Sequence, residues 1–329
     1  MCESDNSLID TQSTIIEITD EDLAQFKRLD HFLVEKTVGL SRSTIKSLFE
    51  AGEITSDEME NLSLKKMPAQ PGKVVINIPP PPPTELEPQN IPIEILFEDE
   101  HLIFLNKPQG LVVHPAPGHP DKTLINAVLY HCPDIEGVGE EKRPGLVHRL
   151  DKGTSGVMVM AKNISTHRAL IEKFSKHDLE RRYECICIGP EVPAGGKIET
   201  QIGRSPTNRI QMSLKPKVGK IAITHYKNLK SFGKIHHVEC LLHTGRTHQI
   251  RVHMSQYLKA SILGDELYGN PKQQIHQIPD GLKSLPFHEP YLHAKVLGIE
   301  HPVTKEVLRF ETEPPEHFQK IKSYLYEIS

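Results

Sequence analysis

The chain has 329 residues, of which 37% are hydrophobic and 25% charged, and it carries a net charge of −4. This length suffices for about two domains with buried cores. No apolar stretch approaches the roughly 18 residues of a membrane-spanning helix, and the N-terminus lacks the basic and apolar segments of a secretory signal. The 5 cysteines are odd in number and scattered. The composition therefore excludes a membrane-spanning protein and a disulfide-stapled secreted domain, and it predicts a cytoplasmic protein with free thiols.

The net charge conceals a strongly basic segment. Between Lys142 and Lys259 the chain has 22 lysines and arginines against 8 acidic residues, whereas the remainder has 17 against 35. Such a segment is either a well-solvated surface or a face that binds the phosphates of a nucleic acid. The composition alone leaves both interpretations open.

The N-terminal part predicts two short helices after a disordered start. Residues 1–18 are polar and acidic and are expected to be disordered. Apolar residues at helical spacing predict a helix over 29–36. A second helix is expected to follow Ser41, which is a suitable N-cap, and to stop at Gly52.

A run of five prolines predicts the domain boundary. Residues 74–78 read as a strand, and the prolines at 79–83 follow directly and favour a stiff polyproline II spacer. We therefore expect a small α/β module over 19–78, a proline-rich linker over 79–90 and a larger domain over 91–329.

The larger domain is predicted to be α+β, with a mixed, mostly antiparallel sheet. Short apolar runs bounded by turn residues predict strands at 102–105, 157–161, 183–188, 221–226 and 236–242. One helix is expected over 165–176, with Leu170, Ile171 and Phe174 facing inward, and another after Thr244. Residues 270–290 are expected to form a surface loop.

The densest polar motif is the segment GLVHRLDKGTSG at residues 145–156, directly before an apolar strand. A carboxylate on a glycine-rich loop that leads into a buried strand is typical of a catalytic group held by a rigid element. Asp151 is the candidate. Taken alone, the same pattern also fits a turn aspartate that hydrogen-bonds its own backbone.

A second motif, HTGRTHQIRVH, spans residues 243–253. Arg246 and Thr247 stand at an expected helix start, which suits phosphate binding. The histidines repeat every five residues and so do not share one helix face, which argues against zinc. Cys185 and Cys187 alternate onto one strand face and are interpreted as core residues.

Motifs for other chemistry are missing from the sequence. It contains no Walker loop, no G-x-G-x-x-G after a strand and no H-E-x-x-H. We therefore expect no nucleotide cofactor and no metal. Ser155 lacks the G-x-S-x-G elbow, so a serine hydrolase stays only as an alternative.

Taken together, these motifs resemble the RluA/RluD family of pseudouridine synthases, and most closely the RluD-type enzymes that act on large-subunit ribosomal RNA. The resemblance covers nearly the whole chain. Its matching segments are HRLD at 148–151 with TSG at 154–156, NKP at 106–108, LVVHP at 111–115, Tyr183, TGRTHQIRVH at 244–253, GD at 264–265, YG at 268–269 and LHA at 292–294.

The resemblance implies an isomerase that converts uridine in RNA to pseudouridine without a cofactor. Asp151 would be the essential carboxylate, as nucleophile or base. Tyr183 would stack under the target base, and Arg251 would pair with Asp151. Arg149 would fill the gap left by the flipped nucleotide, and His148, Arg246 and Thr247 would contact the RNA.

Residues 19–78 are similar to an S4 RNA-binding module, which implies that Arg42 and Lys46 bind RNA. The sequence departs from that pattern at 54–61, which is acidic where a phosphate would lie. The expected partner is large-subunit ribosomal RNA or its assembly particle, bound by a monomer. A transfer RNA pseudouridine synthase and an RNA-binding ribosome-assembly factor with dispensable catalysis are the alternatives.

Overall fold

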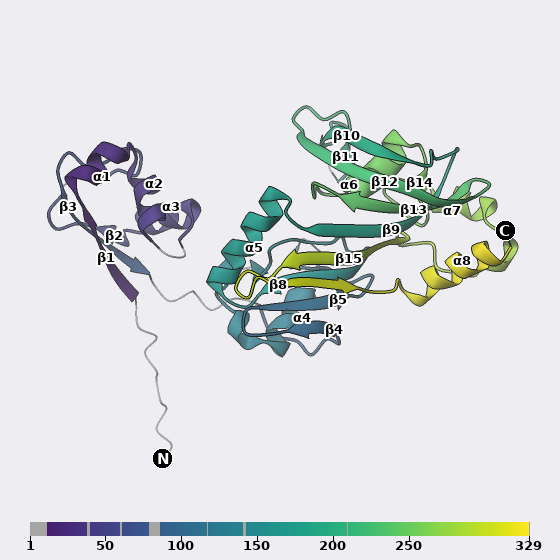
Figure 1. Ribbon diagram of the computed structural model, residues 1–329, viewed down its shortest axis with the longest axis horizontal. Helices are drawn as coiled ribbons and strands as arrows, with labels where there is room; N and C mark the ends of the chain where they lie inside the picture. Colours follow the sequence, from purple (N-terminus) through teal and green to yellow (C-terminus); the bar gives the residue numbers. More distant parts are fainter. Residues whose placement is uncertain are drawn as a thin grey trace, which may run out of the picture. The chain divides into compact units, whose positions relative to one another are not determined.

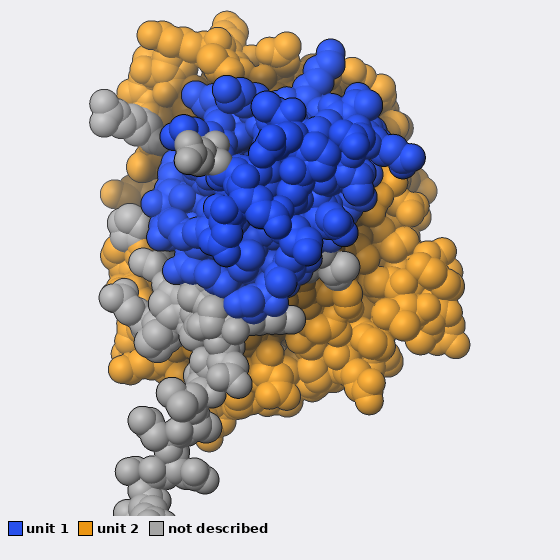
Figure 2. All heavy atoms as spheres, turned by 90° about the vertical axis from the view of Figure 1, so that its left-hand side faces the viewer, with its two compact units in different colours: residues 1–83 blue, residues 84–329 orange. Residues whose placement is uncertain are grey.

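A computed structural model describes residues 12–37, 40–59, 61–78, 86–116, 118–140, 143–208 and 210–328. The chain divides into two compact units, Met1–Pro83 and Thr84–Ser329, which Figure 2 distinguishes by colour. Each unit has a hydrophobic core of its own.

The first unit packs short helices on a small antiparallel sheet. Its described residues form three strands in the order β1-β3-β2. In chain order the elements are β1 (Gln12–Ile18), α1 (Asp20–Gln25), α2 (Leu29–Lys36), α3 (Arg42–Glu50), β2 (Ile54–Thr55) and β3 (Gly72–Ile78). Phe32, Ile45 and Ile76 are fully buried and join α2, α3 and β3 in one core.

The two predicted helices of this unit are confirmed. The side chain of Ser41 accepts a hydrogen bond from the backbone of Thr44 and caps α3. Gly52 follows α3 with φ 80°, in the left-handed region that glycine tolerates. Helix α3 therefore begins and ends where its capping residues predict, and α2 covers the residues 29–36 that the apolar spacing predicts.

The prediction of disorder over residues 1–18 is wrong for 12–18, which form β1. This strand pairs with β3 from Gln12 to Ile18. Ile16 and Ile18 alternate onto the covered face and are buried, so the strand is stabilised by a partner about 60 residues away in the chain. Residues 1–11 lie outside the described part.

The second unit contains a long curved sheet flanked by helices (Figure 1). Its helices are α4 (Leu124–His131), α5 (Ile164–Lys176), α6 (Gln249–Val252), α7 (Pro271–Gln274) and α8 (Glu316–Glu327). Its strands are β4 (Glu94–Glu98), β5 (Leu102–Lys107), β6 (Gly139–Glu140), β7 (Arg143–Pro144), β8 (Ser155–Ala161), β9 (Glu180–Ile188), β10 (Gly195–Arg204), β11 (Met212–Ser213), β12 (Lys220–Phe232), β13 (Ile235–Leu242), β14 (Ser261–Ile262), β15 (Leu292–Glu300) and β16 (Val307–Glu311). Short 3-10 turns cover Pro133–Ile135, Ile275–Gln277 and Asp280–Leu282, and a π-helical turn covers His253–Tyr257.

The large sheet is mixed and mostly antiparallel, as predicted. Over the described residues it has 11 strands, with the main order β11-β10-β12-β13-β9-β15-β8-β5-β4, while β14 pairs with β9 and β16 with β15. Among these pairings only β8 with β15 is parallel. The predicted strands correspond to β5, β8, β9, β12 and β13, whose apolar residues line the core.

Three details of this unit correct the sequence prediction. Residues 86–90 were expected to be part of the linker, yet Leu86 is buried in the core and the Gln89 backbone binds that of Asn126. Ile171 is 46% exposed rather than inward, whereas Leu170 and Phe174 of the same helix pack in the core. Residues 270–290 contain helical turns and bury Ile278 and Leu282 instead of forming only a surface loop.

Cysteine placement agrees with the core interpretation. Cys185 and Cys187 are buried free thiols on one face of β9. In the part of the chain that is described, no helix has the length and apolar character needed to cross a membrane.

Candidate active site

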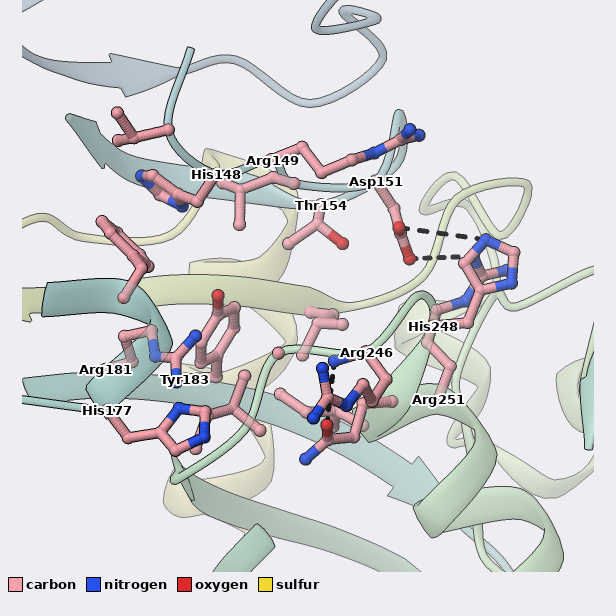
Figure 3. A pocket seen from close by; sticks show the side chains of 18 of the residues that line it. His148, Arg149, Asp151, Thr154, His177, Arg181, Tyr183, Arg246, His248 and Arg251 are labelled. Carbon is pink, nitrogen blue, oxygen red and sulfur yellow. Dashed lines mark hydrogen bonds and ion pairs between the residues drawn. The ribbon is translucent and has the colours of Figure 1, made fainter. Parts of the chain in front are cut away.

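A cleft of about 390 Å³ opens in the middle of the large sheet. Its walls come from the loop before β8, the end of α5, strands β9 and β15, and the loop between β13 and α6 (Figure 3). The polar side chains that line it are His148, Arg149, Asp151, Thr154, Ser175, His177, Arg181, Tyr183, Arg246, His248, Gln249 and Arg251. Both motifs singled out from the sequence therefore meet in one cleft.

A buried lysine holds the loop that carries Asp151 through hydrogen bonds to backbone carbonyls. Lys107 is fully buried, and its Nζ donates to the carbonyls of Pro108 at 2.9 Å, Leu111 at 2.9 Å and Lys152 at 3.2 Å. Burial lowers the pKa of Lys107 to about 7, against the attraction of Asp151 and Glu289. The lysine thus connects the end of β5 to the residue next to Asp151.

Arg251 joins Asp151 to a second, deeper carboxylate. Its Nη1 lies 3.2 Å from Asp151 Oδ2, while its Nε and Nη2 donate to the two carboxylate oxygens of Asp265 at 2.8 Å each. The Asp265 side chain is fully buried and also accepts from the backbone N–H groups of Leu267 and Tyr268. A guanidinium group with two hydrogen bonds to one buried carboxylate has little freedom to move, so Arg251 presents one N–H to Asp151 in a fixed direction.

His248 approaches the same carboxylate from the other side. Its Nε2 lies 3.8 Å from Asp151 Oδ1, and its Nδ1 lies 2.8 Å from the Tyr268 hydroxyl. That hydroxyl accepts from the backbone N–H of Met212, so its own proton is available for His248 Nδ1. Burial lowers the pKa of His248, and the neutral ring then carries its proton on Nε2, facing Asp151.

The backbone of His248 supports this placement. The residue has φ 56°, in the left-handed region, and directly precedes α6. Such a conformation in a non-glycine residue is uncommon and is kept only where surrounding contacts hold it. The hydrogen bond to Tyr268 and the start of α6 supply those contacts.

Tyr183 and His148 form the apolar side of the cleft. Burial raises the pKa of Tyr183 to about 12, so the phenol is protonated at neutral pH. His148 stacks on Phe174 with ring centroids 4.5 Å apart, and its Nε2 accepts from the backbone N–H of Val159. Burial lowers the pKa of His148 to about 3, so this ring is neutral and braces the loop that carries Asp151.

The charges in the cleft are unbalanced. Arg251 is neutralised by Asp151 and Asp265, but Arg149, Arg181 and Arg246 form no ion pair with any carboxylate of the described residues. Arg149 is exposed, but Arg181 is buried and Arg246 half-buried, and such cations are normally paired. The cleft is therefore prepared for an anionic ligand.

The predicted site residues do not all gather here. Asp151, Tyr183, Arg251, Arg149, His148 and Arg246 line the cleft, whereas Thr247 is exposed and does not. Helix α6 starts only at Gln249, whose side chain accepts from the backbone of Arg246, so the expected helix-end phosphate site has lost that N–H group.

Arg42 and Lys46 lie on α3 of the first unit, whereas the residues that line the cleft belong to the second unit. Arg42 pairs with Asp30 at 2.8 Å, and Lys46 pairs with Glu50 at 3.5 Å.

Across the residues that are described, no group of three or more histidine, cysteine, aspartate or glutamate side chains is placed to hold a metal ion.

Several residues of the site, His248 and His177 among them, carried no role in the sequence prediction. Lys107, Asp265 and Tyr268 belong to matched motifs, so their positions were visible but their contacts were not. Arg181 had no signal beyond strand alternation, which places it and Tyr183 on the same face of β9.

Comparisons with known proteins agree with this geometry. Residues 101–256 match the family model described as RNA pseudouridylate synthase. Ribosomal large subunit pseudouridine synthase D of Zymomonas mobilis is 42% identical, over 89% of this chain and 92% of that protein. An uncharacterized RNA pseudouridine synthase of Synechocystis is 40% identical, over 91% of this chain and 89% of that protein.

A solved structure shows the same fold. Human RNA pseudouridylate synthase domain containing 4 superposes with a TM-score of 0.56 at 25% identity and covers 71% of this chain and 93% of its own. The chain thus belongs to the RluA/RluD family of RNA pseudouridine synthases, isomerases that convert uridine in RNA to pseudouridine.

Proposed function

We propose that this enzyme isomerises specific uridines of large-subunit ribosomal RNA, with Asp151 as the essential catalytic carboxylate. The observation that carries the proposal is the position of Asp151, held by Arg251 in a cleft whose other arginines have no acidic partner among the described residues. The ribosomal substrate is supported by relatives such as the Zymomonas mobilis enzyme, whose name states that substrate.

The environment of Asp151 suits a group that acts on the sugar or the base. Its side chain is 18% exposed, so one bound nucleotide reaches it while bulk water is largely excluded. Arg251 fixes one carboxylate oxygen, and His248 directs an N–H toward the other. A carboxylate oriented this way can attack the ribose or remove a proton without first reorganising its surroundings.

Tyr183 offers the surface on which the target base would lie. It sits on β9 and lines the same cleft as Asp151. Because its phenol is protonated at neutral pH, Tyr183 serves as a stacking platform and as a proton donor rather than as a strong base.

The reaction requires the target nucleotide to leave the RNA stack. The cleft is within the range of about 300–1,000 Å³ of sites that enclose small molecules, and it lies in the interior of the sheet. A uridine reaches Asp151 only if it is flipped out. Arg149 is exposed at the rim, where it fills the gap left in the RNA.

We further propose that the first unit is an S4-like RNA-binding module. The α2–α3 pair on a three-stranded sheet supports this, while the pairing of Arg42 and Lys46 with acidic residues argues for modest affinity. Replacing both with alanine in the full chain should weaken RNA binding less than tenfold. An unchanged dissociation constant would show that these two residues do not contribute to RNA binding.

Tritium release from RNA labelled at uridine C5 tests the proposed function. The wild-type enzyme should release tritium from large-subunit ribosomal RNA transcripts and not from transfer RNA transcripts. Release only from transfer RNA would transfer the assignment to the alternative substrate. No release from either transcript would contradict the proposal for free RNA.

A genetic test separates catalysis from ribosome assembly. Cells that lack the protein should regain the missing pseudouridine with the wild-type gene and not with Asp151→Ala. If Asp151→Ala also cures any defect in subunit assembly, the RNA-binding assembly role is the essential one, and the modification is dispensable.

A further inference from the structure

Arg181 is a buried cation that the proposed chemistry does not use. Its residue exposure is only 7%, and it lies on β9 two positions before Tyr183. Within the described residues its only hydrogen bond runs from Nη2 to the carbonyl of His243, at 2.8 Å. A buried guanidinium has five N–H donors, so most of this one is left without an acceptor.

The surroundings of Arg181 are positive rather than negative. Its Nε is buried and has no hydrogen-bond partner in the described structure. Burial lowers the pKa of Arg181; Tyr183 acts against this shift and the charge of Arg246 adds to it. The Phe174 ring, 5.8 Å from the guanidinium carbon, gives only a weak compensating attraction.

Two neighbouring side chains, the cation Arg246 and the imidazole of His177, lie on the same side of the cleft. His177 ends α5 in the left-handed conformation, its buried Nδ1 has no partner among the described residues, and its ring lies 4.8 Å from that of His243. Among the described residues, the Arg246 guanidinium donates only from Nε, to the carbonyl of Ile221. Arg181, His177 and Arg246 all line the cleft, and none has an acidic partner in the described chain.

The loop after β13 leaves room for this arrangement. A Cβ atom on Gly245 would lie 2.7 Å from Arg181 Nη1, so the glycine lets the guanidinium pack against the loop backbone. In Figure 3, Arg181 and Tyr183 lie together, away from Asp151 and Arg251. The positive group is thus placed beside the base platform and at a distance from the reacting carboxylate.

We propose that Arg181, Arg246 and His177 form a phosphate-binding subsite that holds a backbone phosphate next to the flipped nucleotide. The ligand is an anion because a neutral base edge would not balance two unpaired guanidinium groups. A phosphodiester suits the site, since an RNA strand that inserts one nucleotide at Tyr183 brings its own phosphates along. This inference rests on the proposed function in taking RNA as the ligand.

The experiment compares binding of a synthetic RNA that contains the target uridine with RNAs in which one flanking phosphate is a neutral methylphosphonate. Dissociation constants are measured for the wild type and for Arg181→Met. The control is Arg182→Met, because Arg182 is the next residue on β9, faces the other way and pairs with Glu180 and Glu239.

We expect Arg181→Met to weaken binding by about tenfold to a hundredfold, as for loss of charged hydrogen bonds. A methylphosphonate at one flanking position should weaken RNA binding by the wild type and by Arg182→Met to a similar extent. The same methylphosphonate should not further weaken RNA binding by Arg181→Met. Arg181→Lys should retain sensitivity to that methylphosphonate. Equal sensitivity of the wild type and Arg181→Met at every flanking phosphate would overturn the subsite.

Stability separates binding from a structural role. Without RNA, Arg181→Met should have a melting temperature at or above that of the wild type, because an unbalanced buried charge is removed. A lower melting temperature with unchanged binding would make Arg181 structural and overturn the proposal. Tritium release is scored separately, so a wild type that binds but does not react would count against the proposed function and not against the subsite.

Discussion

Replacing Asp265 with asparagine tests whether the deep carboxylate controls the reactive one. The substitution keeps the shape of the side chain but removes its charge. Asp265 accepts four hydrogen bonds, two from Arg251 at 2.8 Å, one from Leu267 at 2.9 Å and one from Tyr268 at 3.1 Å. Asparagine has one acceptor oxygen, and its amide group would face a donor.

The expected loss of stability follows from burial. The Asp265 side chain is fully buried, and removing one partner of a buried ion pair typically lowers the free energy of unfolding by about 3–5 kcal/mol. With the asparagine oxygen in place of Oδ1, Arg251 would keep a neutral hydrogen bond from Nη2, but its Nε would face the amide group and the two-point grip would be lost. A misplacement of about 1 Å at a reacting group can reduce the rate about a hundredfold, so kcat should fall by a factor between about 10 and 100.

Chemical unfolding and tritium release measure the two effects. Glu266→Gln is the matched control, because Glu266 is adjacent and exposed. It should leave both properties unchanged. The result that would contradict this prediction is an Asp265→Asn variant with a free energy of unfolding within about 0.5 kcal/mol of the wild-type value and a wild-type rate of tritium release. Asp265 would then not position Arg251.

Three further predictions follow from the structure. Tyr268→Phe leaves Met212 N–H without its acceptor and His248 Nδ1 without its donor. The free energy of unfolding, measured by denaturant titration, should therefore fall by about 1–2 kcal/mol. Burial tends to raise the pKa of Glu184, but His237, Lys322 and Lys295 lower it to about 2 from 4.5. Its stabilisation, roughly 3 kcal/mol, should be present above pH 4.5 and lost as the pH falls toward 2, so the difference in unfolding free energy between the wild type and Glu184→Gln should shrink over that range. Gly156→Ala would put a Cβ 2.2 Å from the Ala294 carbonyl oxygen at φ 120° and should yield little folded protein in solubility and circular dichroism assays, whereas Gly110→Ala, at φ 84° with open space, should fold with a penalty of about 1–2 kcal/mol.

Elements with local signals could be predicted from the sequence. Caps such as Ser41 and short apolar runs depend on neighbours in the chain, and the corresponding helix and strands are present. Strand β1 was missed because its stability comes from pairing with β3, and no local pattern among its polar flanks reveals that partner. The buried part of 270–290 was missed for the same reason, since Ile278 and Leu282 reach a core formed by distant strands.

The candidate site also has some features that the sequence predicts and others that only the fold reveals. Asp151 and Arg251 are 100 residues apart, so their contact was expected from the family resemblance and not from spacing. Phosphate binding at the helix start stays a prediction, although the backbone N–H of Arg246 is not free for it, because it donates to the side chain of Gln249. Arg181 escaped notice since Arg181 and Arg182 look alike in the sequence, and only the fold buries one and pairs the other with acidic residues.

The most direct measurement of the central claim is single-turnover tritium release by Asp151→Ala, beside its dissociation constant for the same large-subunit ribosomal RNA transcript. Asp178→Ala is the control, because Asp178 is exposed and outside the cleft. The account predicts that Asp151→Ala binds within a few fold of the wild type and releases no tritium, while Asp178→Ala does both normally. Tritium release by Asp151→Ala at the wild-type rate would contradict it.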